Sequence, residues 1–145
     1  MRENRIRSIW NAGGAVLNGW CSMPGAFSAE LMAHQGWDTL TLDMQHGVID
    51  YQVAVHMLTA ISTTSTTPVV RVPWLDPGII MKMLDAGAYA VICPMINGRA
   101  DAEKLVAATR YPPRGQRSYG PVRAQLYAGS DYARHANDTV VCFAM

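Results

Sequence analysis

Residues 39–46 read TLTLDMQH, an apolar run rich in β-strand formers that turns polar at its end. The pattern returns in TPVVRVP (67–73) and YAVICPMI (89–96), and related runs stand at 15–23 (AVLNGWCSM) and 139–145 (TVVCFAM). Segments of helical period separate these runs, punctuated by Gly, Pro, Asp or Asn. This alternation predicts strand–helix units around a parallel sheet.

The helical segments carry recognisable start signals. Asp50 is expected to cap the second helix, and Asp76, with Pro77 behind it, the third. In the first helix, the spacing of Phe27, Leu31 and Met32 places them on one face. These signals support the strand–helix alternation.

The spacing of the runs indicates a barrel. Strand ends near His46, Arg71 and Met95 recur about every 25 residues, the length of one unit in a (β/α)8 barrel of the TIM type. We expect the first five or so units here, so that residues 1–145 form the N-terminal part of one barrel domain whose C-terminal part is missing. An open, doubly wound sheet of five strands is the structural alternative.

The alternation of strand-like and helical segments is interrupted between residues 111 and 129, which read YPPRGQRSYGPVRAQLYAG. Irregular segments of this length usually carry function or form a lid. Its arginines, Arg114, Arg117 and Arg123, could reach a substrate carboxylate or lie on an exposed loop face.

The charge balance of the sequence limits which classes of binding partner are expected. Lys and Arg number 12 against 11 Asp and Glu, so nothing indicates binding to nucleic acid or to an anionic membrane. The three cysteines lack CxxC spacing and are expected to be reduced thiols. No apolar stretch approaches the roughly 18 residues of a membrane span, so we expect a cytoplasmic protein with a small-molecule ligand.

Polar residues at strand ends are the candidates for chemistry, because active sites of parallel β/α folds gather there. Asp43 and His46 end the second run, Arg71 interrupts the third, and Asp85 stands in an apolar turn. A lone arginine in a buried strand needs an anionic partner, either a carboxylate or a substrate. Purely structural roles are the alternative. His46 would then be a hydrogen-bonded turn residue, Asp43 and Asp85 would accept structural hydrogen bonds, and Arg71 would form an internal ion pair with one of them.

Four blocks together carry a family resemblance. GWDTLTLDMQHGVID (36–50), PVVRVPWLDP (68–77), MLDAGAYAVICPM (83–95) and YPPRGQRSYGPVRA (111–124) resemble the HpcH/HpaI aldolase family. These are class II 2-keto-3-deoxy acid aldolases within the phosphoenolpyruvate/pyruvate barrel superfamily, to which macrophomate synthase is related.

The resemblance implies an aldehyde-lyase that cleaves a 4-hydroxy-2-keto acid to pyruvate and an aldehyde through a pyruvate enolate. It makes His46 the general acid/base, paired with Asp85 and with Asp43 close by. Arg71 would bind the keto and carboxylate oxygens of the substrate. An imidazole suits proton transfer near neutral pH, and a guanidinium suits a planar 2-keto carboxylate.

The family resemblance also implies that the complete enzyme binds a divalent metal cation (Mg²⁺, Mn²⁺ or Co²⁺) and forms a homo-oligomer, with a hexamer as the expected state. The family's metal ligands would lie beyond Met145, leaving none in this chain, and Gln45 stands where the best-known members have glutamate. Two alternatives stay open. One is an oxaloacetate-decarboxylating or macrophomate-synthase-like enzyme, and the other is a catalytically incompetent half-barrel.

Overall fold

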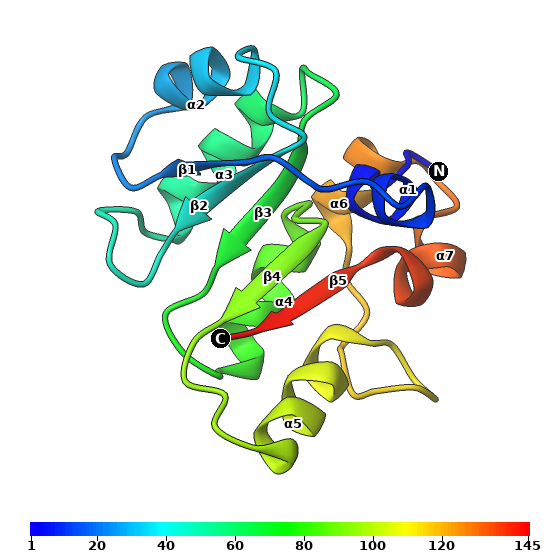
Figure 1. Cartoon of the computed structure of the whole chain (residues 1–145). Helices are drawn as coiled ribbons and strands as arrows, with labels where there is room; N and C mark the ends of the chain where they lie inside the picture. Colours follow the sequence, from blue (N-terminus) through cyan, green and yellow to red (C-terminus); the bar gives the residue numbers. More distant parts are fainter.

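The computed structural model describes residues 1–145 and is built on one parallel sheet (Figure 1). Its strands are β1 (Asn18–Cys21), β2 (Thr39–Asp43), β3 (Thr67–Arg71), β4 (Ala90–Cys93) and β5 (Val141–Ala144). Their order in the sheet is their order in the chain, and every neighbouring pair is parallel. A doubly wound sheet would reverse its order at a switch point. The order is instead that of consecutive barrel strands, as predicted.

The helices that follow the first four strands cover one face of the sheet (Figure 1). The helices after β1 are α2 (Ala26–Ala33), α3 (Tyr51–Ile61), α4 (Pro77–Asp85), α5 (Arg99–Thr109), α6 (Val122–Ala128) and α7 (Tyr132–Thr139). Parallel strands joined by right-handed crossovers place their helices in this way. The result is a helical outer layer and an inner sheet face, as in part of a (β/α)8 barrel.

Side chains alternate between these two faces along each strand. Leu40, Leu42 and Val70 point to the helices and belong to the main core. The residues between them, such as Thr41 and Val69, point to the barrel interior because successive strand residues face opposite sides. The last interior-facing residues of β2 and β3 are therefore polar groups at the carboxyl ends of the strands.

Both aspartates predicted as helix caps are confirmed. The Asp50 carboxylate accepts the backbone N–H of Val53 at 2.8 Å, and Asp76 accepts that of Gly78 at 2.8 Å. Each cap satisfies a backbone donor that the first helical turn leaves unpaired. The starts of α3 and α4 are thereby fixed close to the strand ends that precede them.

Helix α2 shows that apolar spacing does not always mark the buried face. Phe27 and Leu31 are 70% and 51% exposed, whereas Ala29 and Ala33 are buried in the main core. Helix α2 packs mainly against α3. Small side chains on its inner face allow this close approach, whereas Phe27 and Leu31 are left outside and Met32 packs at the edge of the core.

The segment 111–129 contains α6 and is bound to the ends of two other helices through Arg123, and its expected role as a functional segment or lid stays a prediction. Arg123 donates to the carbonyl oxygens of Leu58 at 3.2 Å and Ala86 at 2.5 Å. These carbonyls lie at the ends of α3 and α4, which run back from the carboxyl ends of the strands. Terminal helix carbonyls lack partners within the helix, and a guanidinium satisfies several at once.

An additional helix, α1 (Arg5–Asn11), precedes β1 and has no counterpart in the sequence prediction. Its Ile6 is 1% exposed and packs on the interior side chains Val69, Ala90 and Val141. Helix α1 thus closes the amino-terminal end of the barrel interior. No helix of the structure is both long enough and apolar enough to cross a membrane.

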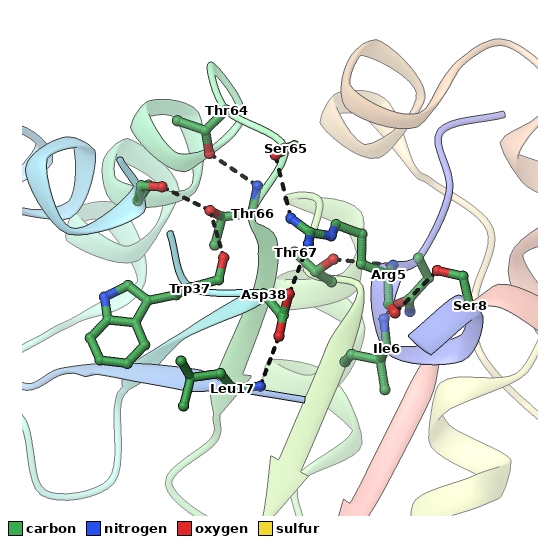
Figure 2. Close-up of polar contacts among 12 residues, drawn as sticks. Arg5, Ile6, Ser8, Leu17, Trp37, Asp38, Thr64, Ser65, Thr66 and Thr67 are labelled. Carbon is green, nitrogen blue, oxygen red and sulfur yellow. Dashed lines mark hydrogen bonds and ion pairs between the residues drawn. The ribbon is translucent and has the colours of Figure 1, made fainter. Parts of the chain in front are cut away.

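Figure 2 shows how α1 is fastened to this end of the sheet. Asp38 accepts Arg5 Nη2 at 2.7 Å and the backbone N–H of Leu17 at 2.9 Å. The backbone N–H of Arg5 donates to Thr67 Oγ1 of β3 at 3.3 Å. A partly exposed ion pair adds little stability. Its main effect is to set the position of α1 relative to the starts of β1 and β2.

The packing of α1 generates a stability prediction. Ile6→Ala should lower the free energy of unfolding by about 2–4 kcal/mol, because it leaves a cavity between α1 and the strands. Ile9→Ala, on the same helix but only half-buried, is the control and should cost less. Urea unfolding of the intact protein measures both, and equal losses would contradict the role of α1 as an interior plug.

Candidate active site

An ion pair joins the carboxyl ends of β2 and β3. Asp43 and Arg71 are register partners on these strands. Arg71 Nε donates to Asp43 Oδ1 at 2.9 Å, and Arg71 Nη2 donates to Oδ2 at 2.6 Å. Their side chains are 4% and 15% exposed, respectively. This paired geometry is the strongest that a guanidinium and a carboxylate can form.

Asp43 also accepts hydrogen bonds from outside the pair. The backbone N–H groups of Gln45 and His46 donate to Oδ1 at 3.0 and 3.2 Å, and the indole N–H of Trp20 donates to Oδ2 at 3.3 Å. Burial alone would raise the pKa of Asp43, but the hydrogen bonds from Arg71, the two backbone groups and Trp20 hold that pKa well below its usual range. Asp43 is therefore an ionised anchor near neutral pH.

His46 lies in the turn that follows β2, with an exposed side chain. Gly47 makes this turn possible, because a Cβ there would lie 2.3 Å from the Asp43 carbonyl oxygen and 2.9 Å from that of Ser22. The turn also pairs with the loop after β1, since the Val48 N–H donates to the Ser22 carbonyl at 2.9 Å. The imidazole is thus carried on a tightly packed turn at the carboxyl end of the sheet.

Asp85 is not part of this arrangement, and its expected pairing with His46 is absent within the chain. Asp85 ends α4 and accepts Arg117 Nη2 at 2.7 Å, and Arg117 also donates to the Tyr132 hydroxyl at 2.9 Å. Because α4 runs back from the end of β3, its last residue lies at the amino-terminal end of the sheet. His46 stands at the opposite end, so the two residues do not pair within this chain, and the expected catalytic role of Asp85 stays a prediction.

The other candidates also lie outside the site. Arg114 pairs with the exposed Asp138, Arg117 is buried, and Arg123 caps helices. Burial raises the pKa of the Cys93 thiol to about 11. A thiol with this pKa is protonated near neutral pH and is a poor nucleophile.

The chain's own residues do not fit a metal ion. Nowhere do three His, Cys, Asp or Glu side chains gather as a ligand set. Asp43, the carboxylate at the site, already accepts five hydrogen bonds. The Gln45 side-chain oxygen is buried without a partner, but it is a single neutral donor atom.

Trp20 is a site residue that the sequence gives little reason to select. It stands in the apolar run NGWC of β1, where a tryptophan would normally be assigned to the core. Its one signal is position, because it comes one residue before the end of β1. Only the pairing of β1 with β2 shows that its indole reaches Asp43.

Asp43→Asn tests the anchoring carboxylate. Removing its charge leaves Arg71 largely buried without a counterion and should cost about 3 kcal/mol of unfolding free energy near neutral pH. The folded-state pKa of Asp43 lies below its unfolded value, so its stabilisation is present above about pH 4 and lost as pH falls further. Denaturant unfolding should therefore show a smaller difference between the two proteins at about pH 3 than at about pH 7. A difference that grows on acidification would contradict the assignment.

Known proteins resemble this chain over nearly its whole length. A hydroxypyruvate/pyruvate aldolase from Rhizorhabdus wittichii is 46% identical over 142 residues, which are 98% of this chain and 57% of that protein. A 4-hydroxy-2-oxo-heptane-1,7-dioate aldolase from Salmonella dublin is 36% identical over 141 residues, covering 95% of this chain and 54% of that protein. The chain spans about half the length of the curated relatives it matches.

Solved structures share the fold. An HpcH/HpaI aldolase/citrate lyase family protein from Burkholderia cenocepacia J2315 has a TM-score of 0.87 at 33% identity, covering 97% of this chain and 58% of that one. The citrate synthase SbnG has a TM-score of 0.84 at 29% identity, and the match covers 100% of this chain and 56% of that one. Macrophomate synthase, at 19% identity, has a TM-score of 0.79 over 99% of this chain and 52% of that one, which shows the fold alone. These likenesses agree with a partial barrel.

The sequence match is to one family and covers most of the molecule. It runs from residue 20 to residue 145 and therefore takes in all five strands except the first two residues of β1. The chain belongs to the HpcH/HpaI aldolase/citrate lyase family.

Proposed function

We propose that the intact protein is a pyruvate-type aldolase that cleaves a 4-hydroxy-2-keto acid to pyruvate and an aldehyde through a pyruvate enolate. The observation that carries this proposal is the ion pair that fixes Arg71 at the carboxyl end of the sheet, in a chain of the aldolase family. We further propose that residues 1–145 are the N-terminal part of one barrel domain in that protein.

Arg71 is assigned to substrate binding. Asp43 occupies its Nε and one Nη2 hydrogen, whereas Nη1 makes no hydrogen bond within the chain. The edge formed by Nη1 and the second Nη2 hydrogen remains for a ligand. Two parallel donors match the adjacent carboxylate and keto oxygens of a 2-keto acid. A fixed positive charge there also stabilises the negative charge that develops on the enolate oxygen during cleavage.

His46 is assigned to proton transfer. Cleavage requires a base to remove the proton of the substrate's 4-hydroxyl, and the pyruvate enolate then takes up a proton at its methylene carbon. An exposed imidazole at the carboxyl end of the sheet can serve in such steps. Asp43 orients the turn through the His46 backbone N–H and carries no proton itself. Within this chain Asp85 is bound to Arg117, and its pairing with His46 is kept as a proposal for the intact protein.

We retain a divalent cation (Mg²⁺, Mn²⁺ or Co²⁺) as a proposal for the intact protein. Such an ion would polarise the keto oxygen as a Lewis acid. The residues of this chain form no site for it, so none of the steps assigned above passes through it. A homo-oligomer, with hexamer as the expected state, is proposed on the same resemblance.

Arg71→Lys tests the substrate-binding assignment. A point charge replaces the planar fork, so pyruvate affinity and kcat/KM should fall together, by about 10- to 100-fold. The measurement is steady-state cleavage of a 4-hydroxy-2-keto acid by the intact protein, with pyruvate inhibition in parallel. Full activity in this variant would overturn the role of Arg71.

His46→Ala tests the proton-transfer assignment separately. We expect kcat to fall by about 10²- to 10⁴-fold while the pyruvate inhibition constant stays close to that of the unaltered protein. His34→Ala, on the loop after α2, is the matched control and should leave kcat unchanged. A weakened affinity for pyruvate with unchanged kcat would assign His46 to binding instead.

Oxaloacetate chemistry is a second candidate. The likeness at 29% identity to SbnG, a citrate synthase rather than an aldolase, is compatible with it. The same enolate would then arise by loss of carbon dioxide instead of an aldehyde. Comparing kcat/KM for oxaloacetate with that for a 4-hydroxy-2-keto acid distinguishes the two.

A further inference from the structure

Three neighbouring strands contribute one row of interacting side chains at the site. Trp20 comes from β1, Asp43 from β2 and Arg71 from β3. Trp20 is the register partner of Thr41, one interior position before Asp43 on β2. From this position the indole contacts Asp43 Oδ2, whereas the backbone N–H groups of the turn after β2 donate to the other carboxylate oxygen, Oδ1.

Trp20 makes two different contacts with the ion pair. Its indole N–H donates to Asp43 Oδ2 at 3.3 Å, the oxygen that also accepts Arg71 Nη2. Its ring lies under the guanidinium, with the Arg71 Cζ atom 4.9 Å from the ring centroid. The first contact stabilises the ionised carboxylate, and the second is a cation–π interaction with the arginine.

Core filling does not account for this tryptophan. Trp20 is 40% exposed and belongs to none of the three buried apolar clusters. A tryptophan kept for packing would be largely buried. The contacts to Asp43 and Arg71 are its specific interactions with other side chains.

We infer that Trp20 is a positioning residue that fixes the orientation of Arg71 for the keto acid. By bonding Asp43 and covering one face of the guanidinium, the indole restricts rotation of both partners. The free Nη1 edge of Arg71 then has one direction in which to bind a ligand. This inference rests on the proposed function, because it assumes that Arg71 binds the substrate carboxylate.

The test uses the intact protein with pyruvate as the probe and isothermal titration calorimetry as the measurement. Trp20→Phe keeps a ring beside Arg71 but removes the N–H donor, and Trp20→Leu removes both contacts. We expect the pyruvate Kd to rise about 5-fold in the first variant and more in the second. KM should rise in parallel while kcat changes less. Trp10→Phe, on α1 with its ring beside that of Phe143 of β5, is the control and should leave Kd unchanged.

A spectroscopic signature shows whether the ligand binds beside Trp20. Pyruvate should change the tryptophan emission of the unaltered protein and of Trp10→Phe, and this change should disappear in Trp20→Phe. If Trp20→Phe lowers the unfolding midpoint, benzothienylalanine at position 20 keeps the shape of the indole and lacks only the N–H donor. It should still raise the pyruvate Kd.

The outcomes distinguish this inference from the proposal beneath it. An unaltered pyruvate Kd in Trp20→Phe and Trp20→Leu, with weakened binding in Arg71→Lys, overturns the role of Trp20 alone. An unaltered Kd in Arg71→Lys overturns the proposed function, and the inference with it. Weaker binding in the Trp20 variants and in Arg71→Lys, but not in Trp10→Phe, supports both.

Discussion

The ion pair between Asp43 and Arg71 is the interaction on which the rest of the site depends. It joins two neighbouring strands at the level where each ends, so the sheet register itself brings the charges together. Through its other hydrogen bonds, the same carboxylate orients the His46 turn and contacts the Trp20 indole. Without the carboxylate, a cation in a largely buried strand would lack a counterion. One anion therefore serves both folding and the arrangement of the site.

The amino-terminal end of the sheet holds interactions that stabilise the scaffold, and the carboxyl end holds the groups that are free to bind a ligand. At the amino-terminal end, α1 closes the interior and Arg123 caps two helices, while Asp85 pairs with the buried Arg117. Each of these interactions holds the scaffold. At the carboxyl end, Arg71 and His46 keep free hydrogen-bonding capacity, which a ligand can use. This division is the general one in β/α barrels, where stability and chemistry lie on opposite faces.

Features that depend on neighbouring residues were predictable from the sequence, and features that depend on distant contacts were not. Asp76 was predictable as a cap, and Asp43 and Arg71 as strand-end residues, because each signal lies within a few positions. The buried face of α2 follows instead from its close approach to α3, which selects Ala29. Asp85 was assigned to His46 because family likeness carries residue identities, whereas the direction of α4 decides which end of the sheet a side chain reaches.

The most direct test of this account is a ¹³C NMR titration of the Asp43 carboxyl group in the intact protein, with the signal assigned by comparison with Asp43→Asn. The account predicts that this signal stays constant from about pH 8 down to about pH 3.5, since the hydrogen bonds keep the pKa of Asp43 well below its usual range. Unperturbed aspartates titrate with a pKa near about 3.9. A titration of Asp43 at or above that value would show that the ion pair with Arg71 does not organise the site.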